Sequence, residues 1–307
     1  MLVLEARGNT DQNDIKDVDM EKSPDWNETW DRIDVRRQSP LAAGLFAQFL
    51  DAGIPAATRP GMTAIEIGCF PGKFIEHVGQ KGYAISGIDV YSRVAEVGEW
   101  ARERGCTIGH FRQVPLADYM AGGFEPFDVV FSLGFIEHFE NFCEILYDHA
   151  ALTKVGGTVL IGAPNFASPT QRALHTVIDR KNIEGHVLDS MYPEVWATFL
   201  TALGFDVLHA GPVGGFGFWS ETQPETPAAG MLQQLLPAMA SSVNQLSAQF
   251  NQKEASYIGV IATKRAELPS REHIGKLVHF CTNLGRQLSL RDGRLAAPGI
   301  DFLCGLV

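Results

Sequence analysis

The stretch AIEIGCFPGKF, residues 64–74, decides the fold. Its first residues are apolar and β-branched, which is the pattern of a buried strand, and Glu66 stands between two isoleucines. Gly68 and Gly72 follow at once, and glycines directly after a strand predict a tight turn whose backbone approaches another group closely. The stretch therefore predicts a strand that ends in a ligand-binding loop.

Short β-branched runs alternate with longer amphipathic segments beyond this loop. AISGIDV, FDVVFSLG and TVLIGAP resemble strands, and KFIEHVGQKG, RVAEVGEWARERG and ENFCEILYDHAALTKVGG resemble helices. Such alternation predicts an α/β domain with a doubly wound, mostly parallel sheet, for which we expect residues 61–265. Before it, apolar residues at helical spacing predict a helical cap at residues 25–60, and the acidic residues 1–24 predict a mobile leader.

Two segments interrupt the alternation, and a tail follows it. Residues 165–190 come after a strand end and are long and polar enough for a lid. Residues 223–253 predict an amphipathic helix with a break at Pro237. The tail, residues 266–307, begins with a helical pattern whose apolar positions predict packing on the domain or on a second copy of the chain, as in a homodimer.

Composition narrows the class of partner. A chain of 307 residues with 45% hydrophobic content buries a full core, and its net charge of −11 disfavours nucleic acid, because phosphate binding needs clustered Lys and Arg. No apolar run approaches the roughly 20 residues of a membrane span, and no export signal opens the chain. The five scattered cysteines lack metal-ligand spacing. We expect a cytoplasmic protein with reduced thiols, no metal, no membrane partner and a small-molecule ligand.

A second carboxylate, Asp89, ends the next predicted strand, 23 residues after Glu66. Ligands of parallel sheets bind at the carboxyl ends of the strands, where a carboxylate can accept hydrogen bonds from ribose hydroxyls. A dinucleotide loop reads G-x-G-x-x-G and binds a diphosphate, whereas this loop reads G-x-x-x-G after a glutamate. Because Glu66 would repel a diphosphate and attract a cation, the loop favours S-adenosylmethionine (SAM) as the cofactor.

Four runs, in this order, resemble the motifs of class I SAM-dependent methyltransferases: IEIGCFPGKF, ISGIDV, FDVVFSLGFIEHF and LTKVGGTVLIGAPN. They are most similar to the small-molecule group that includes the ubiquinone-pathway O-methyltransferases. The resemblance spans residues 64–264 and implies a seven-stranded Rossmann-like sheet. It also implies that SYIGVIATKR is the antiparallel last strand, beside DVLHAG.

The resemblance further implies a cofactor site. Gly68 and Gly72 would border the methionine part, Asp89 would bind the ribose, and residues 132–135 would lie along the cofactor. The expected cofactor-binding set is Glu66, Gly68, Cys69, Phe70, Gly72, Asp89, Val90, Ser132, Leu133 and Gly134. The chain departs from the family after the third strand, where an acid often meets the adenine and only Asp118 is near.

Methyl transfer to a hydroxyl needs a base, and two histidines are the catalytic candidates. His138 follows the fourth strand, and His186 lies in the expected lid. Each has a structural alternative: His138 as a packed histidine at a helix start and His186 as a surface histidine of a loop. The aromatic run GPVGGFGFW, residues 211–219, is a candidate wall of the acceptor pocket.

We expect an O-methyltransferase that acts on a hydroxyl of a sugar, glycan or secondary metabolite. N-methylation of a small molecule stays open. An NAD-dependent oxidoreductase shares the sheet and Asp89, but its loop would lack Glu66. An aminopropyl transferase would need paired acids after the fourth strand, and a non-catalytic SAM-binding scaffold would have no use for intact loop glycines.

Overall fold

The computed structural model describes residues 30–37, 41, 45–220, 224, 226–246 and 254–290. The expected leader and the apolar end of the tail, GIDFLCGLV, lie outside the described residues. Within the described ranges, no helix has the length and apolar character needed to span a membrane.

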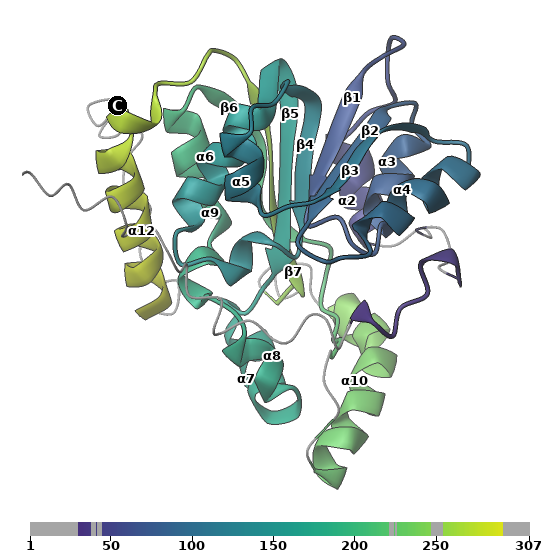
Figure 1. Ribbon diagram of the computed structural model, residues 1–307. Helices are drawn as coiled ribbons and strands as arrows, with labels where there is room; N and C mark the ends of the chain where they lie inside the picture. Colours follow the sequence, from purple (N-terminus) through teal and green to yellow (C-terminus); the bar gives the residue numbers. More distant parts are fainter. Residues whose placement is uncertain are drawn as a thin grey trace, which may run out of the picture.

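One sheet of seven strands forms the centre of the protein, in the order β3-β2-β1-β4-β5-β7-β6 (Figure 1). The strands are β1 (Thr63–Ile67), β2 (Ala84–Asp89), β3 (Thr107–Gln113), β4 (Phe127–Leu133), β5 (Thr153–Pro164), β6 (Phe205–Val213) and β7 (Tyr257–Lys264). β1 pairs in parallel with β2 and β4, and β7 lies antiparallel between β5 and β6. The predicted fold class, including the antiparallel last strand, is confirmed.

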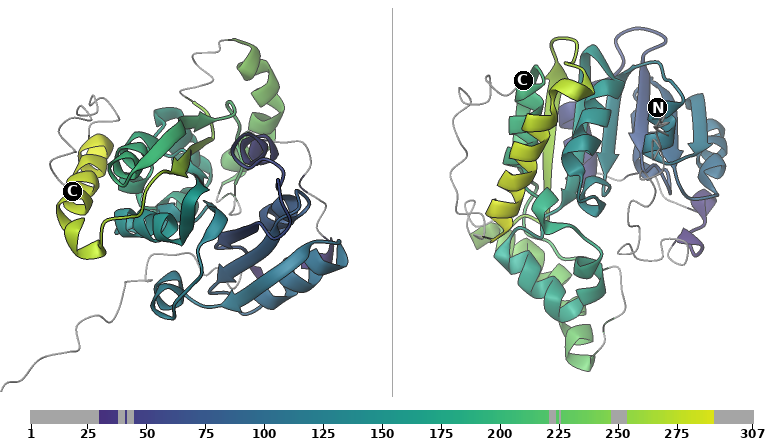
Figure 2. Two further views of the ribbon diagram at one scale, coloured as in Figure 1. Left: turned by 90° about the horizontal axis from the view of Figure 1, so that it is seen from above. Right: turned by 60° about the vertical axis from the view of Figure 1, so that its left-hand side comes forward.

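Helices cover both faces of the sheet, as Figures 1 and 2 show. The principal helices are α2 (Leu45–Gly53), α3 (Lys73–Gly79), α4 (Val94–Glu103), α5 (Leu116–Ala121), α6 (Phe142–Leu152), α9 (Pro193–Ala202) and α12 (Gly275–Leu290). Side chains of α2, α3 and α4 share one buried cluster, and those of α5, α6, α9 and α12 share the other. The sheet therefore separates two hydrophobic cores.

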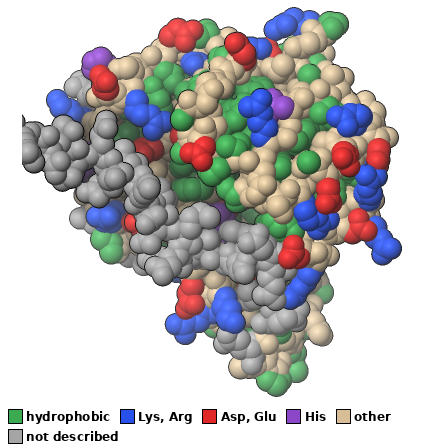
Figure 3. Space-filling model, viewed as in Figure 1, with side chains coloured by type: hydrophobic (Ala, Val, Ile, Leu, Met, Phe, Trp, Pro, Cys, Tyr) green, Lys and Arg blue, Asp and Glu red, His purple; other side chains and the backbone are tan. Residues whose placement is uncertain are grey.

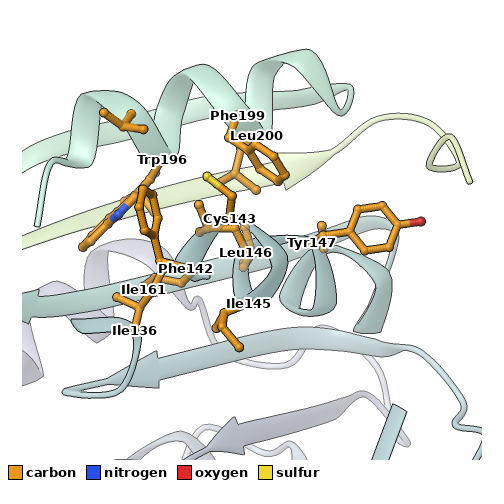
Figure 4. Packing of buried hydrophobic residues seen from close by; sticks show 14 of the residues in the cluster. Ile136, Phe142, Cys143, Ile145, Leu146, Tyr147, Ile161, Trp196, Phe199 and Leu200 are labelled. Atoms are coloured by element: carbon orange, nitrogen blue, oxygen red, sulfur yellow. The ribbon is translucent and has the colours of Figure 1, made fainter. Parts of the chain in front are cut away.

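The alternation of strand side chains explains this division. In β1, Ile65 and Ile67 join the core beneath α6, whereas Ala64 joins the opposite core, because successive side chains of a strand point to opposite faces. Figure 4 shows part of the core that contains α6, where Phe142 and Leu146 of α6 pack with Trp196, Phe199 and Leu200 of α9. Both cores hold the carboxyl ends of β1, β2 and β4 in fixed positions.

The segment at residues 165–190, which we expected to be a polar loop, is largely helical. It contains α7 (Pro169–Ile178), α8 (Arg180–Glu184) and the short 3-10 helix η4 (Leu188–Ser190). Ser168 caps α7 through a hydrogen bond that its side chain accepts from the Gln171 N–H, and the N-cap is a strong start signal. The N-cap residue Ser168 was therefore the helix signal in the sequence of this segment.

The later insert also differs from the prediction in one respect. α10 (Pro227–Leu246) continues through Pro237, where we expected a break. A proline removes one backbone hydrogen bond and clashes with one carbonyl, but the remaining turns can hold the helix together. In Figure 1, α7, α8 and α10 lie together below the sheet, at the end where β5 finishes.

The tail helix α12 packs on the domain itself. Leu277, Cys281, Leu284 and Leu288 are buried, and the helix contacts α6, α9 and η4. A second anchor lies just before it, where the Tyr147 hydroxyl donates a hydrogen bond to the Pro269 carbonyl (2.9 Å). Leu277, Cys281, Leu284 and Leu288 of α12 are therefore buried by packing within the chain.

Candidate active site

The loop between β1 and α3 is held against the end of β2. The Gly68 N–H donates to the Ile88 carbonyl (2.9 Å). Gly68 has a φ of +72°, and a Cβ there would lie 2.8 Å from the ring of Phe135. Gly72 has a φ of +97°, and a Cβ there would collide with Val97. Both positions require glycine, so the loop backbone can pass close to a ligand.

Glu66 lies at the end of β1 and is only 1% exposed. Within the described residues, its Oε2 has no hydrogen-bond partner. Burial and the nearby charge of Asp89 raise the pKa of Glu66 well above its ordinary value, while the Ile75 N–H opposes the shift. A buried oxygen without a partner costs about 1–3 kcal/mol. A cationic ligand group that met this oxygen would recover that cost.

Asp89 ends β2, which pairs with β1, and lies two residues beyond Gly87, the residue that pairs with Glu66. Asp89 is close enough to Glu66 for its charge to raise the pKa of Glu66. Its Oδ2 accepts a hydrogen bond from the Phe70 N–H and its Oδ1 accepts one from the Tyr91 N–H, each at 2.9 Å. Burial raises the pKa of Asp89, and these N–H groups oppose the shift. Each carboxylate oxygen retains further acceptor capacity, so the side chain is oriented to bind two adjacent hydroxyls.

The neighbours of these acids divide into inward and outward residues. Cys69 is buried, and its burial raises the pKa of the thiol, so it stays protonated. Phe70 is also buried, and the centroid of its ring lies 5.7 Å from that of Trp30 and 4.6 Å from that of Tyr91. Val90 is 49% exposed. Cys69 and Phe70 therefore support the loop from inside, whereas Val90 faces outward beside Asp89.

Residues 132–134, at the end of β4, present mainly their backbone at the carboxyl end of the sheet, because the side chains of Ser132 and Leu133 are buried. The Ser132 side chain is fully buried and lies 3.0 Å from Nε2 of His149 on α6. Leu133 packs in the core against Gly162. Gly134 follows with a φ of +76° and donates its N–H to the Gly162 carbonyl (2.9 Å). A cofactor along this run would meet the backbone rather than the side chains of Ser132 and Leu133.

The two predicted catalytic histidines face each other. His138 belongs to the 3-10 helix η3 (Ile136–His138), His186 follows α8, and their ring centroids are 4.7 Å apart. Nδ1 of His138 lies 3.1 Å from the Gly185 carbonyl, and Nδ1 of His186 contacts the Asn182 carbonyl. Because a carbonyl only accepts, each Nδ1 carries the proton and each Nε2 carries the lone pair.

Burial lowers the pKa of both histidines. For His186 the pKa falls to about 3, and the neighbouring His138 adds to the effect of burial. Both rings are therefore neutral at neutral pH. So weak a base removes a hydroxyl proton poorly, since general bases work best with a pKa near the operating pH. A neutral imidazole remains a good acceptor of a hydrogen bond or a metal bond.

Aromatic rings line the region next to His186. Phe166 lies 5.1 Å from His186 and stacks on Trp219 (5.8 Å), which stacks in turn on Tyr257 (4.7 Å). Trp219 belongs to the run that we expected to wall an acceptor pocket, but the sequence did not indicate Phe166 or Tyr257 as its partners. Phe166 lies two residues beyond the last residue of β5, and Tyr257 is the first residue of β7. The antiparallel pairing of these strands brings the two residues close together.

Sequence reasoning missed a buried polar pair behind this wall. His175 of α7 is fully buried, and its Nδ1 lies 3.5 Å from Oδ2 of Asp179. Asp179 also accepts a hydrogen bond from the Asn182 side chain (2.9 Å). The spacing of four residues between His175 and Asp179, which places both on one side of a helix, was the signal in the sequence.

Figure 3 shows one face of the protein, on which Lys and Arg side chains are interspersed with Asp and Glu over the described residues. The described cysteines Cys69, Cys106, Cys143 and Cys281 are free and buried.

Part of the chain is similar in sequence to bacterial proteins that are named as methyltransferases. The "Ubiquinone biosynthesis O-methyltransferase" of Caulobacter vibrioides is 32% identical over 120 residues, which cover 39% of this chain and 47% of the relative. The protein of the same name from Haemophilus ducreyi is 29% identical over 110 residues, which cover 34% and 46%. The chain thus spans about half the length of the curated relatives it matches.

The solved structures that are similar to the chain have low sequence identity to it. A SAM-dependent methyltransferase from Archaeoglobus fulgidus is 18% identical, with a TM-score of 0.48 over 78% of this chain and 98% of the other. The methyltransferase domain family model matches residues 36–210, more than half of the 307 residues. The chain therefore belongs to the methyltransferase domain family.

Proposed function

We propose that the chain transfers the methyl group of SAM to a hydroxyl of a small molecule, and that Glu66, Asp89 and the loop of Gly68 hold the cofactor. The observation that carries this proposal is the buried Oε2 of Glu66, which has no hydrogen-bond partner among the described residues and is close enough to Asp89 for the two charges to interact. SAM brings an ammonium and a sulfonium group to such an acid, together with ribose hydroxyls for Asp89.

The reaction is a direct displacement. The acceptor oxygen forms a bond to the methyl carbon while the bond from carbon to sulfur breaks, which leaves S-adenosylhomocysteine as a neutral thioether. The proton of the acceptor hydroxyl passes to solvent water, so the products are the methyl ether, S-adenosylhomocysteine and H⁺. Orientation in a water-poor site supplies up to about 7–11 kcal/mol when the geometry is ideal.

The acceptor hydroxyl is proposed to lie at the pair of His138 and His186, inside the aromatic wall of Phe166 and Trp219. The relatives from Caulobacter and Haemophilus, which are named as O-methyltransferases, support a hydroxyl over an amine. A flat aromatic acceptor would pack against the partly exposed ring of Trp219, behind which Phe166 is fully buried, and this favours a phenolic metabolite over a sugar. On the sequence grounds given above, we place the reaction in the cytoplasm.

Isothermal titration tests the cofactor site. We expect SAM to bind and NADH not to bind. Glu66→Gln keeps the size of the side chain and should lower the affinity for SAM by about 10-fold, since hydrogen bonds to charged groups contribute about 1.5–3 kcal/mol. Asp128→Asn is the matched control, because Asp128 binds Lys154 and Thr63 at the opposite edge of the sheet. Binding of NADH without binding of SAM would contradict the proposal.

A second experiment tests the acceptor. Phenolic compounds, sugars and amines are incubated with SAM that carries a labelled methyl group, and products are identified by mass spectrometry. A labelled phenol ether is the expected product. Label on nitrogen would replace the hydroxyl by an amine, and binding of SAM without any labelled product would favour a non-catalytic scaffold.

A further inference from the structure

Three possible metal ligands meet where η3 touches the end of α8. Glu137, His138 and His186 each offer one ligand atom, and these atoms all lie within 4.8 Å of one another. Glu137 is buried and the two histidines are half-buried. The ligands thus come from two segments that are far apart in sequence but share one partly sheltered position.

The backbone fixes this meeting point. The Val187 N–H donates to the Glu137 carbonyl (2.7 Å), one residue from His186. His138 in turn donates through Nδ1 to the Gly185 carbonyl. Both bonds run between the same two short segments, so the side chains of Glu137, His138 and His186 are held at one place without any ligand.

The histidines also have the tautomer that a metal requires. Their Nδ1 atoms bond to the carbonyls of Gly185 and Asn182, which directs both Nε2 lone pairs away from the backbone. A ligating histidine almost always donates its other N–H in this way, because the bond fixes the ring and raises its basicity toward the metal. The Asn182 side chain is held by Asp179, which extends this support.

The donor set selects a class of ion. Two neutral imidazoles and one carboxylate suit Zn²⁺, Mn²⁺, Fe²⁺ or Co²⁺, whereas Ca²⁺ and Mg²⁺ prefer sites made of oxygen atoms. Bonds of about 2.0–2.2 Å place neighbouring ligands about 3.0–3.4 Å apart. Small side-chain rotations suffice to reach that spacing from separations of at most 4.8 Å. Three protein ligands leave positions open for water or an acceptor.

We propose that Glu137, His138 and His186 form a binding site for a first-row divalent transition-metal ion. The ion joins η3 to the segment of residues 165–190, so metal binding stabilises the contact between them. The site was not expected from the sequence, which shows no metal-ligand spacing in its cysteines. One consequence rests on the proposed function: an acceptor hydroxyl bound to such an ion would ionise more readily, which would ease the loss of its proton.

Metal binding by the full chain tests the site. The protein is treated with a chelator, dialysed, and titrated with Co²⁺ while its visible absorption is recorded; Zn²⁺ is then measured by competition and by elemental analysis. We expect one ion per chain and a higher melting temperature with Zn²⁺. His186→Ala should lower the affinity by more than the roughly 10–100-fold typical of losing a supporting contact.

Two further variants make the test specific. Glu137→Gln keeps the size of the side chain and should also lower the metal affinity. It provides the test if His186→Ala fails to fold. The double variant His273→Ala and His279→Ala removes two exposed histidines elsewhere in the chain and should bind as the wild type does. Wild-type affinity in His186→Ala or Glu137→Gln, or no binding above that of a denatured sample, would overturn the proposal.

The outcome is separable from the proposed function. SAM affinity is measured on the same metal-free protein. Loss of metal binding in the cluster variants with unchanged SAM affinity supports a metal site outside the cofactor loop. A protein that binds SAM but no metal would overturn the metal site alone, and one that binds metal but no SAM would overturn the proposed function alone.

Discussion

Two groups of side chains lie at the same end of the sheet: the cofactor edge, Glu66 and Asp89, and the histidine edge, His138 and His186. Burial shifts the pKa values of the two groups in opposite directions. Burial raises the pKa of both carboxyl groups, which shifts each of them toward its neutral form. Burial lowers the pKa of both histidines, so the neutral form is favoured there as well. Each edge avoids a bare buried charge and is therefore suited to receive a cation.

The two edges also differ in construction. The first comes from a compact stretch in which glycines and backbone N–H groups place Glu66 and Asp89. The second needs η3, the end of α8 and the ends of β5 and β7. A local motif can encode the first edge, whereas the second exists only after the sheet has formed.

The largest expected effect is the acid lability of the histidine side of the sheet. Burial lowers the pKa of His149, beneath Ser132, to about 4 from 6.5. Between pH 4 and pH 6.5, His149 is protonated in the unfolded chain but neutral in the folded one. The free energy of unfolding is therefore highest above pH 6.5 and decreases as the pH falls toward 4. At about 1.4 kcal/mol per pH unit, His149 contributes about 3 kcal/mol to this loss.

Urea unfolding at pH 7 and pH 4.5 measures this contribution. The free energy of unfolding of His149→Gln should depend less steeply on pH than that of the wild type, although the variant is less stable at pH 7. His279→Gln, at an exposed position of α12, should keep the wild-type dependence. Parallel curves for the wild type and His149→Gln would remove His149 as the cause.

The next effect concerns the cofactor edge. Asp89→Ala should weaken SAM binding by about 10- to 100-fold, because it removes a charged acceptor worth about 1.5–3 kcal/mol and releases the N–H groups of Phe70 and Tyr91. Glu125→Ala, at an exposed acid just before β4, is the control. Titration calorimetry measures both; equal affinities for the two variants would mean that Asp89 does not touch the ribose.

A pair of glycine substitutions compares the loop with a remote turn. Gly61 has a φ of +78° and open space around its Cβ position, whereas Gly68 has a similar φ and Phe135 against it. Both Gly→Ala changes carry the backbone cost of about 1–2 kcal/mol. Only Gly68→Ala adds overpacking of about 1–3 kcal/mol, and only it should reduce SAM affinity. Equal melting temperatures would show that Phe135 moves aside freely.

The smallest effect is a proton released when SAM binds. The pKa of Glu66 is raised above 4.5 in the free protein, and a bound cation lowers it again, so binding expels a proton below the raised pKa. SAM affinity should therefore increase with pH in that window, by at most about tenfold per pH unit. Calorimetry in two buffers of different ionisation enthalpy detects the proton, and Glu66→Gln should abolish the difference between buffers.

The fold and the cofactor edge were predictable because their determinants are local. The alternation of strands and helices, the glycines after β1 and the position of Asp89 follow from periodicity and turn geometry, and the family match supports the same reading. Helix lengths near residues 165–190 and the continuity of α10 through Pro237 were not predictable, since packing with the neighbouring elements outweighs the preferences of a short segment.

The sequence by itself determined which strand ends carry acids and glycines, because a strand and its turn place their side chains within a few residues. It also identified His138 and His186 as candidates. Only the tertiary structure decided that these two rings face each other, that Glu137 joins them, and that Ser132 turns into the core toward His149. Those facts depend on contacts between distant segments, whose distances no local spacing encodes.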